Sequence, residues 1–365
     1  RTHSFPTRRS SDLIRYFVEH YNDFRTEIPV SDEISGILSL YGDKPYRTGT
    51  YRTDFLIDQN NDIRFIEITC RFALNGFFIS GFFDMMLNWF LADKPWINKI
   101  DEYTPFYDHL VEYFGDFRHF CLLEGADKHN ETKYLIPIIQ NAGYQLHIIP
   151  ADCITDNLRL LKDAAVISEL SHAELCRQPL KTVEAILRSN LLNDLRTVFL
   201  VHDKRLFSLF NKKSFQANVL TKEEMDILSR AVVPTYTRLE RPDLWSEAFE
   251  RKDAWIIKPC ALGKGKDVYA GKLTAEAQWK GIFASDAIRD MTLQPYIEQR
   301  KFSGSIGSDR YNDFAVGTLL FFDDHYFGPG LFRASSYPIT NRVDDRKIAA
   351  LVTPDTGNFD MDHIL

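Results

Sequence analysis

The sequence predicts a protein of the α/β (α+β) class, with mixed or antiparallel sheets beside a small parallel α/β layer. Two β-hairpins are indicated at 51–69 and 312–332, where β-branched and aromatic residues surround short polar turns. Between them, 117–201 alternates short apolar runs with helical patterns, which is typical of a parallel sheet. A strand, a glycine-rich loop and a second strand follow at Asp253–Lys272. The 365 residues provide enough chain for two or three domains.

The composition is that of an ordinary globular protein, with 44% hydrophobic and 26% charged residues. A net charge of −7 argues against general nucleic-acid binding, so a phosphate site must be local. The longest apolar stretch, Phe77–Leu91, is interrupted by Gly81, Asp84 and Asn88, so no membrane partner is expected. The five cysteines form no CxxC pair, which indicates reduced thiols and a cytoplasmic protein. The oligomeric state is not indicated.

The first residues call for separate treatment. His3–Leu13, HSFPTRRSSDL, matches one translated frame of a common sequencing adapter. We therefore expect residues 1–13 to be an artefact and exclude them from reasoning about the fold. A basic tail or targeting segment is the alternative.

Residues 14–116 are predicted to form the first part of the molecule. Helices are indicated at Leu13–Asn22, Ser31–Leu40, Phe77–Leu91 and Tyr107–Phe114, and a hairpin is indicated at Tyr51–Asp58 and Ile63–Thr69. The Phe77–Leu91 helix is apolar on nearly all sides, which predicts that it is buried.

Residues 117–201 are predicted to form the parallel layer. Strands are indicated at Phe120–Leu123, Tyr144–Pro150, Ala164–Ser168 and Val198–Val201, and helices at Glu131–Ala142 and Thr182–Ser189. Residues 202–341 contribute helices at Arg205–Phe210, Lys222–Arg230 and Ala275–Phe283, and strands at Ala254–Ile257, Val268–Lys272 and Met291–Ile297. Thr221 and Glu224 have the spacing of a capping box. The tail 342–365 gives no signal.

The loop after Lys258 is a candidate phosphate site. Gly263 and Gly265 would let backbone N–H groups approach phosphate oxygens, and Lys264 and Lys266 would neutralise charge. The loop lacks the GxxxxGK[ST] pattern of a Walker A motif. A basic hairpin turn with no ligand is an equal alternative.

The first hairpin carries charges on one face. Arg52 and Asp54 lie two residues apart, as do Glu67, Thr69 and Arg71 on the partner strand. Folding about the turn at 59–62 places Asp54 opposite the region of Glu67. Two facing carboxylates suit Mg²⁺, which prefers one or two carboxylates together with phosphate oxygens. Cross-strand arginine–carboxylate pairs on a solvated face are the alternative.

Two further cations stand at the ends of predicted strands. Lys204 begins a helix, where a cation opposes the helix dipole, so a ligand phosphate would explain it; a solvated helix start explains it equally. Arg333 follows a strand end, where it would bind a carboxylate or phosphate bidentately or form a structural pair.

Together these motifs resemble the ATP-grasp superfamily, and their order resembles its circularly permuted branch, which includes eukaryotic-type glutathione synthetases and glutathionylspermidine synthetases. The quoted segments are Lys204, Ile257-Lys258-Pro259, Gly263–Gly265, Gln294-Pro295-Tyr296-Ile297 and the front hairpin RTDFLIDQNNDIRFIEITCR. The similarity covers roughly 46–91 and 197–341, and it implies that the parallel layer between them, at 117–201, is a substrate-binding domain. Two positions depart from the family pattern. Thr69 stands where a magnesium-binding Asn is expected, and Leu262 stands where glutathione synthetases carry an acidic metal ligand.

The resemblance implies an ATP-dependent ligase that joins a small-molecule carboxylate to an amine through an acyl-phosphate, with ATP and Mg²⁺ as cofactors. It implies nucleotide contacts by Lys204, Lys258, Gly263, Lys264, Gly265, Lys266, Gln294, Tyr296 and Ile297. It implies Mg²⁺ ligation by Asp54, Glu67 and Thr69, and acyl-phosphate or substrate contacts by Arg52, Arg71 and Arg333. A small-molecule kinase and a non-catalytic ATP-binding protein are the alternatives, the latter because of Thr69.

Overall fold

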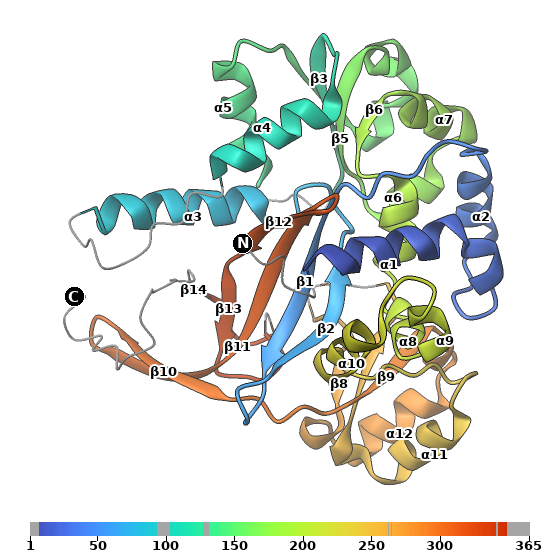
Figure 1. Cartoon of the computed structure of the whole chain (residues 1–365), viewed down its shortest axis with the longest axis vertical. Coiled ribbons are helices and arrows are strands. Elements are labelled where there is room, and N and C mark those ends of the chain that lie inside the picture. The colour runs from blue at the N-terminus through green and yellow to red at the C-terminus, as the bar shows by residue number, and fades with distance from the viewer. Residues whose placement is uncertain are drawn as a thin grey trace.

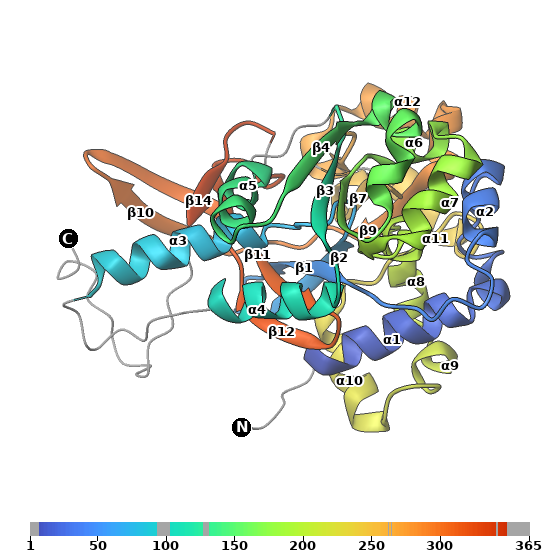
Figure 2. The ribbon, with the colours of Figure 1, turned by 90° about the horizontal axis from the view of Figure 1, so that it is seen from above.

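Figure 1 shows the computed structural model of the chain, which describes residues 7–92, 103–126, 131–261, 263, 265–340 and 342–348. Three sheets lie one above another in this view. A large antiparallel sheet occupies the middle, a parallel sheet lies at one end, and a small antiparallel sheet lies at the other. In the view from above in Figure 2, the parallel sheet overlaps part of the large sheet, which lies beneath it. The predicted combination of antiparallel sheets and a parallel layer is therefore present.

The large sheet has seven strands and joins the two ends of the described chain. Its main path runs β14-β13-β11-β1-β2, with β10 and β12 also paired to β11. The bounds are β1 Thr50–Ile57, β2 Ile63–Thr69, β10 Lys301–Ile306, β11 Asp309–Phe322, β12 His325–Pro329, β13 Phe332–Ser335 and β14 Arg346–Ile348. Because β1 lies between β2 and β11, the front hairpin and the late strands share one surface.

The parallel sheet has four strands in the order β4-β3-β5-β6, with bounds β3 His119–Glu124, β4 Leu146–Pro150, β5 Ala164–Glu169 and β6 Asn190–Leu192. The small sheet has the order β8-β7-β9, with bounds β7 Trp255–Pro259, β8 Tyr269–Ala270 and β9 Met291–Pro295. The predicted strand at 268–272 is thus shorter, since Gly271–Leu273 turns into a 3-10 helix (η6).

Helices cover both faces of the large sheet. The α-helices are α1 Thr7–Glu19, α2 Asp32–Ser39, α3 Phe77–Phe90, α4 Tyr103–Phe114, α5 Thr132–Asn141, α6 His172–Arg177, α7 Leu180–Arg188, α8 Leu206–Phe210, α9 Lys213–Gln216, α10 Lys222–Ala231, α11 Pro242–Glu250 and α12 Glu276–Ala284. Short 3-10 helices lie at Tyr21–Phe24, Ala151–Cys153, Thr155–Leu161, Lys252–Ala254 and Asp286–Asp290. Helices α1, α8 and α10 pack on one face through a core that includes Phe17, Phe207 and Phe321. On the other face, α3 and α4 lie between the large sheet and the parallel layer.

The helix α1 begins at Thr7, within the segment that we set aside. Leu13 is buried in the same core as Phe17, and the Ser10 hydroxyl lies 3.1 Å from that of Tyr51. The adapter origin of residues 1–13 stays a prediction, but from Thr7 onward this segment is part of the folded structure.

Two predictions about secondary structure are wrong. Residues 197–201 form a π-helix (η4, Thr197–Val201) where a strand was expected. All five of its residues are buried, and a short run that is buried on every side has no periodicity to separate helix from strand. The helix α3 was expected to be buried, but its second half is exposed: Trp89 and Phe90 are 73% and 64% accessible. In both views this end projects away from the large sheet (Figures 1 and 2).

The capping box at the start of α10 is confirmed. The Thr221 hydroxyl accepts the Glu224 N–H at 3.3 Å, and the Glu224 carboxylate accepts the Thr221 N–H at 2.8 Å. We expect Thr221→Ala to lower the free energy of unfolding by about 1 kcal/mol, because an N–H of the first turn loses its partner. Urea unfolding measures this. Lys222→Ala, which leaves the cap intact, is the control, and an equal loss in both variants would contradict the assignment.

Within the described part of the chain, no helix has both the length and the apolar character needed to cross a membrane.

Candidate functional site

A cavity of about 600 Å³ opens between the large sheet and the small sheet. This volume is within the range of roughly 300–1,000 Å³ that small-molecule sites occupy. Its wall includes side chains from β1, β2, β11 and β13 on one side and from β7 on the other. The start of α3, the segment 338–340 and, from the loop after β7, Gly263, Gly265 and Val268 also line it. Gly265, with φ +65°, lies where a side chain would approach Ile339 to 3.2 Å, so the loop can pack closely there.

Nine residues of the predicted site line this cavity. They come from the front hairpin, the segment after the π-helix, the end of β7 with its loop, and β13: Arg52, Glu67, Thr69, Arg71, Lys204, Lys258, Gly263, Gly265 and Arg333. The first four are distant in sequence from the rest. They meet because β1 pairs with β11, and because Lys204 is fixed to the loop by its N–H bond to the Cys260 carbonyl at 2.9 Å.

Asp54 faces Glu67 across the hairpin, as predicted from the turn. Its carboxylate is fully buried and accepts hydrogen bonds from two guanidinium groups. Arg52 Nε donates to Oδ1 at 3.0 Å, and Arg333 Nη2 donates to Oδ2 at 2.7 Å. Asp54 therefore fixes the positions of both arginines, which line the cavity, although Asp54 itself does not line the cavity.

Glu67 and the two lysines form a second charged group. Lys204 Nζ lies 3.4 Å from Glu67 Oε2. Burial opposes ionisation of Glu67, but Lys204 and then Lys258 hold its pKa below the usual value. Burial also lowers the pKa of Lys258 to about 8, with Glu67 acting against this shift. Lys258 is only 6% exposed and lies close to Lys204. Two neighbouring buried lysines favour the binding of an anion.

The charge balance of the cavity differs from that of the whole protein. Among the described residues, six lining side chains are cationic, namely Arg52, Arg71, Lys204, Lys258, Arg333 and Lys347. Three are acidic, namely Glu67, Glu131 and Asp345. A chain with a net charge of −7 thus gathers an excess of positive charge at one site. This arrangement can bind a multiply charged anion.

Of the three predicted Mg²⁺ ligands, two are placed where they could hold this cation. Glu67 and Thr69 line the cavity beside the lysines, and one carboxylate together with ligand phosphates can hold Mg²⁺. Both oxygens of Asp54 accept from arginines, so this carboxylate does not fit as a direct ligand. Within the ranges described, no three His, Cys, Asp or Glu side chains are grouped for metal binding.

Among the described residues, the other predicted nucleotide contacts, Gln294, Tyr296, Ile297 and Lys266, do not line the cavity. Gln294 is buried, and its side chain donates to Thr235 Oγ1 at 2.8 Å and to the Ile66 carbonyl at 3.2 Å. Tyr296 is half-buried with its N–H bonded to the Ala254 carbonyl, and Ile297 is partly buried next to it. Lys266 is exposed beyond the loop. Lys264 and Leu262 lie outside the described residues.

One end of the cavity is apolar and contains a polar group without a partner. Leu56, Ile66, Ile256 and Val268 line it together with Gln299. The Gln299 side chain donates to the Pro338 carbonyl at 3.2 Å, and its buried Oε1 has no hydrogen-bond partner. The aliphatic side chains at this end suit an apolar part of a ligand. Gln299 was missed because it lies two residues beyond the segment that resembles the family hinge.

An acidic residue of the cavity wall, Glu131, was also missed. Glu131 lines the cavity and accepts N–H bonds from Gly76 at 2.7 Å and Phe78 at 3.1 Å, at the start of α3. Burial raises the pKa of Glu131 despite these bonds. Burial, and next to it Glu131, raises the pKa of Glu169 to about 8. Glu131 was predicted only as the start of a helix, and no local pattern indicated that it would reach α3.

The tail beyond Arg342 contributes to the site as well, although no signal was seen there. β14 pairs with β13, with Lys347 opposite Arg333. Asp345 and Lys347 line the cavity and form an ion pair with each other. The sequence pattern that could have indicated this is their spacing of two residues, because residues two apart in a strand lie on the same face.

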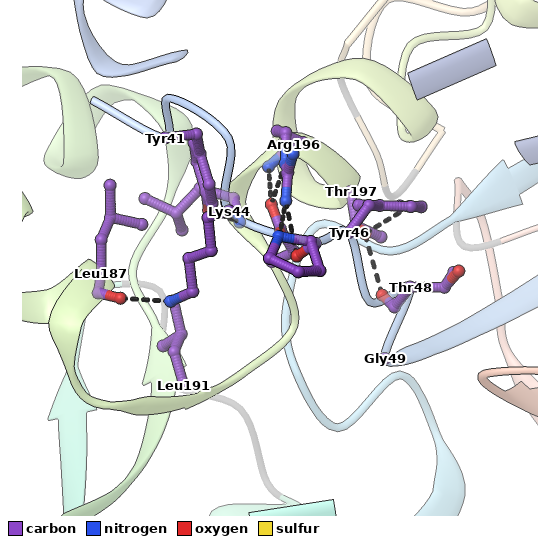
Figure 3. A network of polar contacts seen from close by, with 12 residues as sticks. Tyr41, Lys44, Tyr46, Thr48, Gly49, Leu187, Leu191, Arg196 and Thr197 are labelled. Carbon is purple, nitrogen blue, oxygen red and sulfur yellow. Dashed lines mark hydrogen bonds and ion pairs between the residues drawn. The ribbon is translucent and has the colours of Figure 1, made fainter. Parts of the chain in front are cut away.

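The π-helix positions Lys204 and is tied to the segment before β1. Thr197 Oγ1 donates to the Thr48 carbonyl at 2.8 Å and lies 2.8 Å from the Tyr46 hydroxyl. Arg196 donates to the Pro45 carbonyl at 3.1 Å. Figure 3 shows this network, in which Lys44 also bonds to the Leu187 carbonyl. The front of the chain thereby fixes the backbone that leads to Lys204.

Comparison with known proteins gives a family and a fold. A family model described as the AnkG N-terminal domain matches residues 10–200. No protein in a search of curated sequences matches the chain. Among solved structures, the apo form of a glutathione synthetase-like effector from Globodera pallida matches with a TM-score of 0.58 and 13% identity, covering 90% of this chain and 83% of that one. The chain therefore has a glutathione synthetase-like fold, as the sequence motifs indicated.

Proposed function

The chain belongs to the AnkG N-terminal domain family, and on the geometry of its cavity we propose that it is an ATP-dependent ligase that joins a small-molecule carboxylate to an amine. The observation that carries the proposal is the convergence of Lys204, Lys258, Gly263 and Gly265 on one cavity. The glutathione synthetase-like fold supports it.

The triphosphate would lie against the two lysines. Lys204 and Lys258 are both almost fully buried, so their charges act in a medium of low dielectric constant and are poorly screened. Backbone N–H groups at Gly263 and Gly265 would approach the same phosphates. The adenine base would occupy the apolar end, beside Leu56, Ile66 and Ile256.

The substrate carboxylate would lie near Arg52 and Arg333, which Asp54 holds in place. In the first step a carboxylate oxygen attacks the γ-phosphorus, the bond to the β-phosphate oxygen breaks, and ADP leaves. In the second step the amine nitrogen attacks the acyl carbon, phosphate leaves with the electrons of the C–O bond, and the nitrogen loses a proton. Arg52, Arg71 and Arg333 would stabilise the negative charge on the transferred group.

Mg²⁺, when bound, neutralises phosphate charge and orients the triphosphate. Glu67, with Thr69 beside it, would hold it in this chain. The arginine clamp on Asp54 favours a second candidate function, which is nucleotide binding without turnover. That alternative follows if a single carboxylate is too few to hold the metal.

The discriminating experiment is a screen for ADP release with the full chain against panels of amino acids, peptides and polyamines. The ligase predicts ADP release that requires both a carboxylate and an amine. Release with one substrate and a stable phosphate product would instead identify a kinase. A shift in melting temperature with ATP but no turnover would identify the binding protein. The absence of any response to ATP would refute all three.

A further inference from the structure

We propose that Glu131 is a positioning residue of the cavity, which fixes the backbone at the start of α3 so that the Arg52 guanidinium is directed at the terminal phosphate of the nucleotide. The inference rests on the proposed function, in which Arg52 stabilises negative charge on the transferred group. It adds a carboxylate next to the parallel layer that acts on the site through another side chain.

The turn that leads into α3 forms part of the cavity wall and has a backbone that needs support. Asn75 and Gly76 both line the cavity, and both have left-handed backbone angles, with φ +49° and +97°. Two consecutive left-handed residues, one of them not glycine, are costly and persist where surrounding groups fix them. From the large sheet, the Thr50 carbonyl accepts a hydrogen bond from Asn75 Nδ2 at 3.0 Å.

Two buried carboxylates support the turn from the side of the parallel layer. Glu131, the residue before α5, accepts the Gly76 N–H through Oε2 at 2.7 Å and the Phe78 N–H through Oε1 at 3.1 Å. Glu169, at the end of β5, accepts the Ala73 N–H at 3.2 Å. Because Glu131 uses both oxygens, an amide in its place, with a single acceptor oxygen, would lose one of these bonds.

Gly76 connects Glu131 to Arg52. A β-carbon placed on Gly76 would lie 3.6 Å from Arg52 Nη1, so the guanidinium packs against this glycine. On its other side, Arg52 Nε donates to Asp54 Oδ1 at 3.0 Å. Burial raises the pKa of Glu131, while the bonded N–H groups and Arg52 act against this rise, because a nearby cation favours the ionised carboxylate. The position of Arg52 is therefore set by Asp54 and by the turn that Glu131 holds.

A displaced arginine should affect one nucleotide more than another. Arg52 would contact the γ-phosphoryl group, which ADP lacks. We therefore expect Glu131→Gln to weaken binding of a non-hydrolysable β,γ-imido analogue of ATP by about tenfold, while ADP stays within about threefold of its wild-type affinity. Calorimetric titration in the presence of Mg²⁺ measures both. A merely structural role would weaken the two ligands alike.

Glu174→Gln is the matched control. Glu174 also uses both carboxylate oxygens at the start of a helix of the parallel layer, where it accepts the Ala126 N–H at 2.7 Å and the Ser171 N–H at 2.8 Å. It does not line this cavity. Its replacement should lower the melting temperature without changing the ratio of the two affinities.

A double variant tests the route through Arg52. If Glu131 acts by positioning Arg52, Glu131→Gln should add less than about twofold to the loss that Arg52→Ala causes alone, because residues that act as one unit are not additive. Should Glu131→Gln fail to fold, Gly76→Ala takes its place. Its added methyl group would crowd the same guanidinium, so it should give the same selective loss of the analogue.

Each outcome decides a different claim. A loss that is selective for the analogue and absent on the Arg52→Ala background supports the inference. Unchanged affinities, equal losses for both ligands, or losses that add to those of Arg52→Ala overturn it and leave the proposed function standing. Wild-type binding of the analogue by Arg52→Ala also overturns it, because Glu131 then has no contact to act through. If the wild type binds neither ligand, the proposed function and the inference both fail.

Discussion

Replacing Lys258 with Met is expected to weaken ATP binding by roughly 100-fold or more and to abolish the shift in melting temperature that ATP produces. The ammonium group is buried to 6% exposure beside Lys204 and the glycine loop, so no solvent cation can take its place. Removing one member of a buried charge pair costs about 2–5 kcal/mol, and each 1.4 kcal/mol is a factor of ten in affinity. Calorimetric titration and thermal unfolding with ATP measure the two effects.

Lys280→Met is the matched control, since Lys280 lies on the exposed face of α12 and pairs with Glu276 at 3.0 Å. It carries the same change of charge but should leave ATP binding unchanged, because surface charges are screened by salt. Equal effects of the two substitutions would show that overall charge, and not the cavity, governs binding. Full nucleotide binding by Lys258→Met would show that the site is wrongly assigned.

The same lysine gives a dependence on pH whose sign can be stated. The pKa of Lys258 falls from 10.5 to about 8 in the folded protein. Between these values the unfolded chain holds a proton that the folded protein has lost, so this group makes the folded state more stable as pH rises through the window. Anion binding has the opposite trend, because deprotonation above about pH 8 removes the charge. Both trends should be present in the wild type and reduced in Lys258→Met.

Asp54→Asn is expected to destabilise the protein by roughly 3 kcal/mol or more. The carboxylate is fully buried and pairs with both Arg52 and Arg333, so its loss removes the acceptor that these two partly buried guanidinium groups share. Guanidinium chloride unfolding without ligand measures the loss. Activity would fall as well, since the two arginines would no longer be held against the cavity.

Asp243→Asn provides the comparison, because Asp243 also accepts from an arginine, Arg241, but both side chains are exposed. Exposed ion pairs contribute little, so its unfolding curve should overlay that of the wild type. The experiment also separates two roles of Asp54. If it were chiefly a metal ligand, Asp54→Asn would leave the metal-free protein as stable as the wild type or more so, by removing a repelling carboxylate.

The local parts of this site could be predicted, and the long-range parts could not. The pairing of Asp54 with Glu67 follows from one hairpin and its turn, so the spacing in sequence was sufficient. The contact from Arg333 to Asp54 depends on which strand β11 pairs with, and no local pattern contains that choice. A resemblance to a family gave the order of the motifs, which is why Lys204 and Lys258 were found.

The failures have the same physical origin. Gln294 stands at the expected hinge position, but the neighbouring Thr235 and Ile66 satisfy its amide, and only tertiary structure shows this. Residues 198–201 are apolar because they are buried between two hydrophobic cores. A strand and a π-helix can bury such a short run equally well, so the sequence did not distinguish them. Glu131 lies 55 residues after Gly76 in the sequence, next to the start of α5, and it reaches the site because it accepts the Gly76 N–H at the start of α3.

The central place of β1 in the large sheet has a consequence for biosynthesis. One edge of β1 pairs with β2, which emerges from the ribosome directly after it, but the other edge pairs with β11, at residues 309–322. Until that late strand is made, a row of backbone amides and carbonyls next to Tyr51 and Phe55 has no native partner. In a nascent chain this edge of β1 therefore stays open to edge-to-edge association until residues 309–322 have been made.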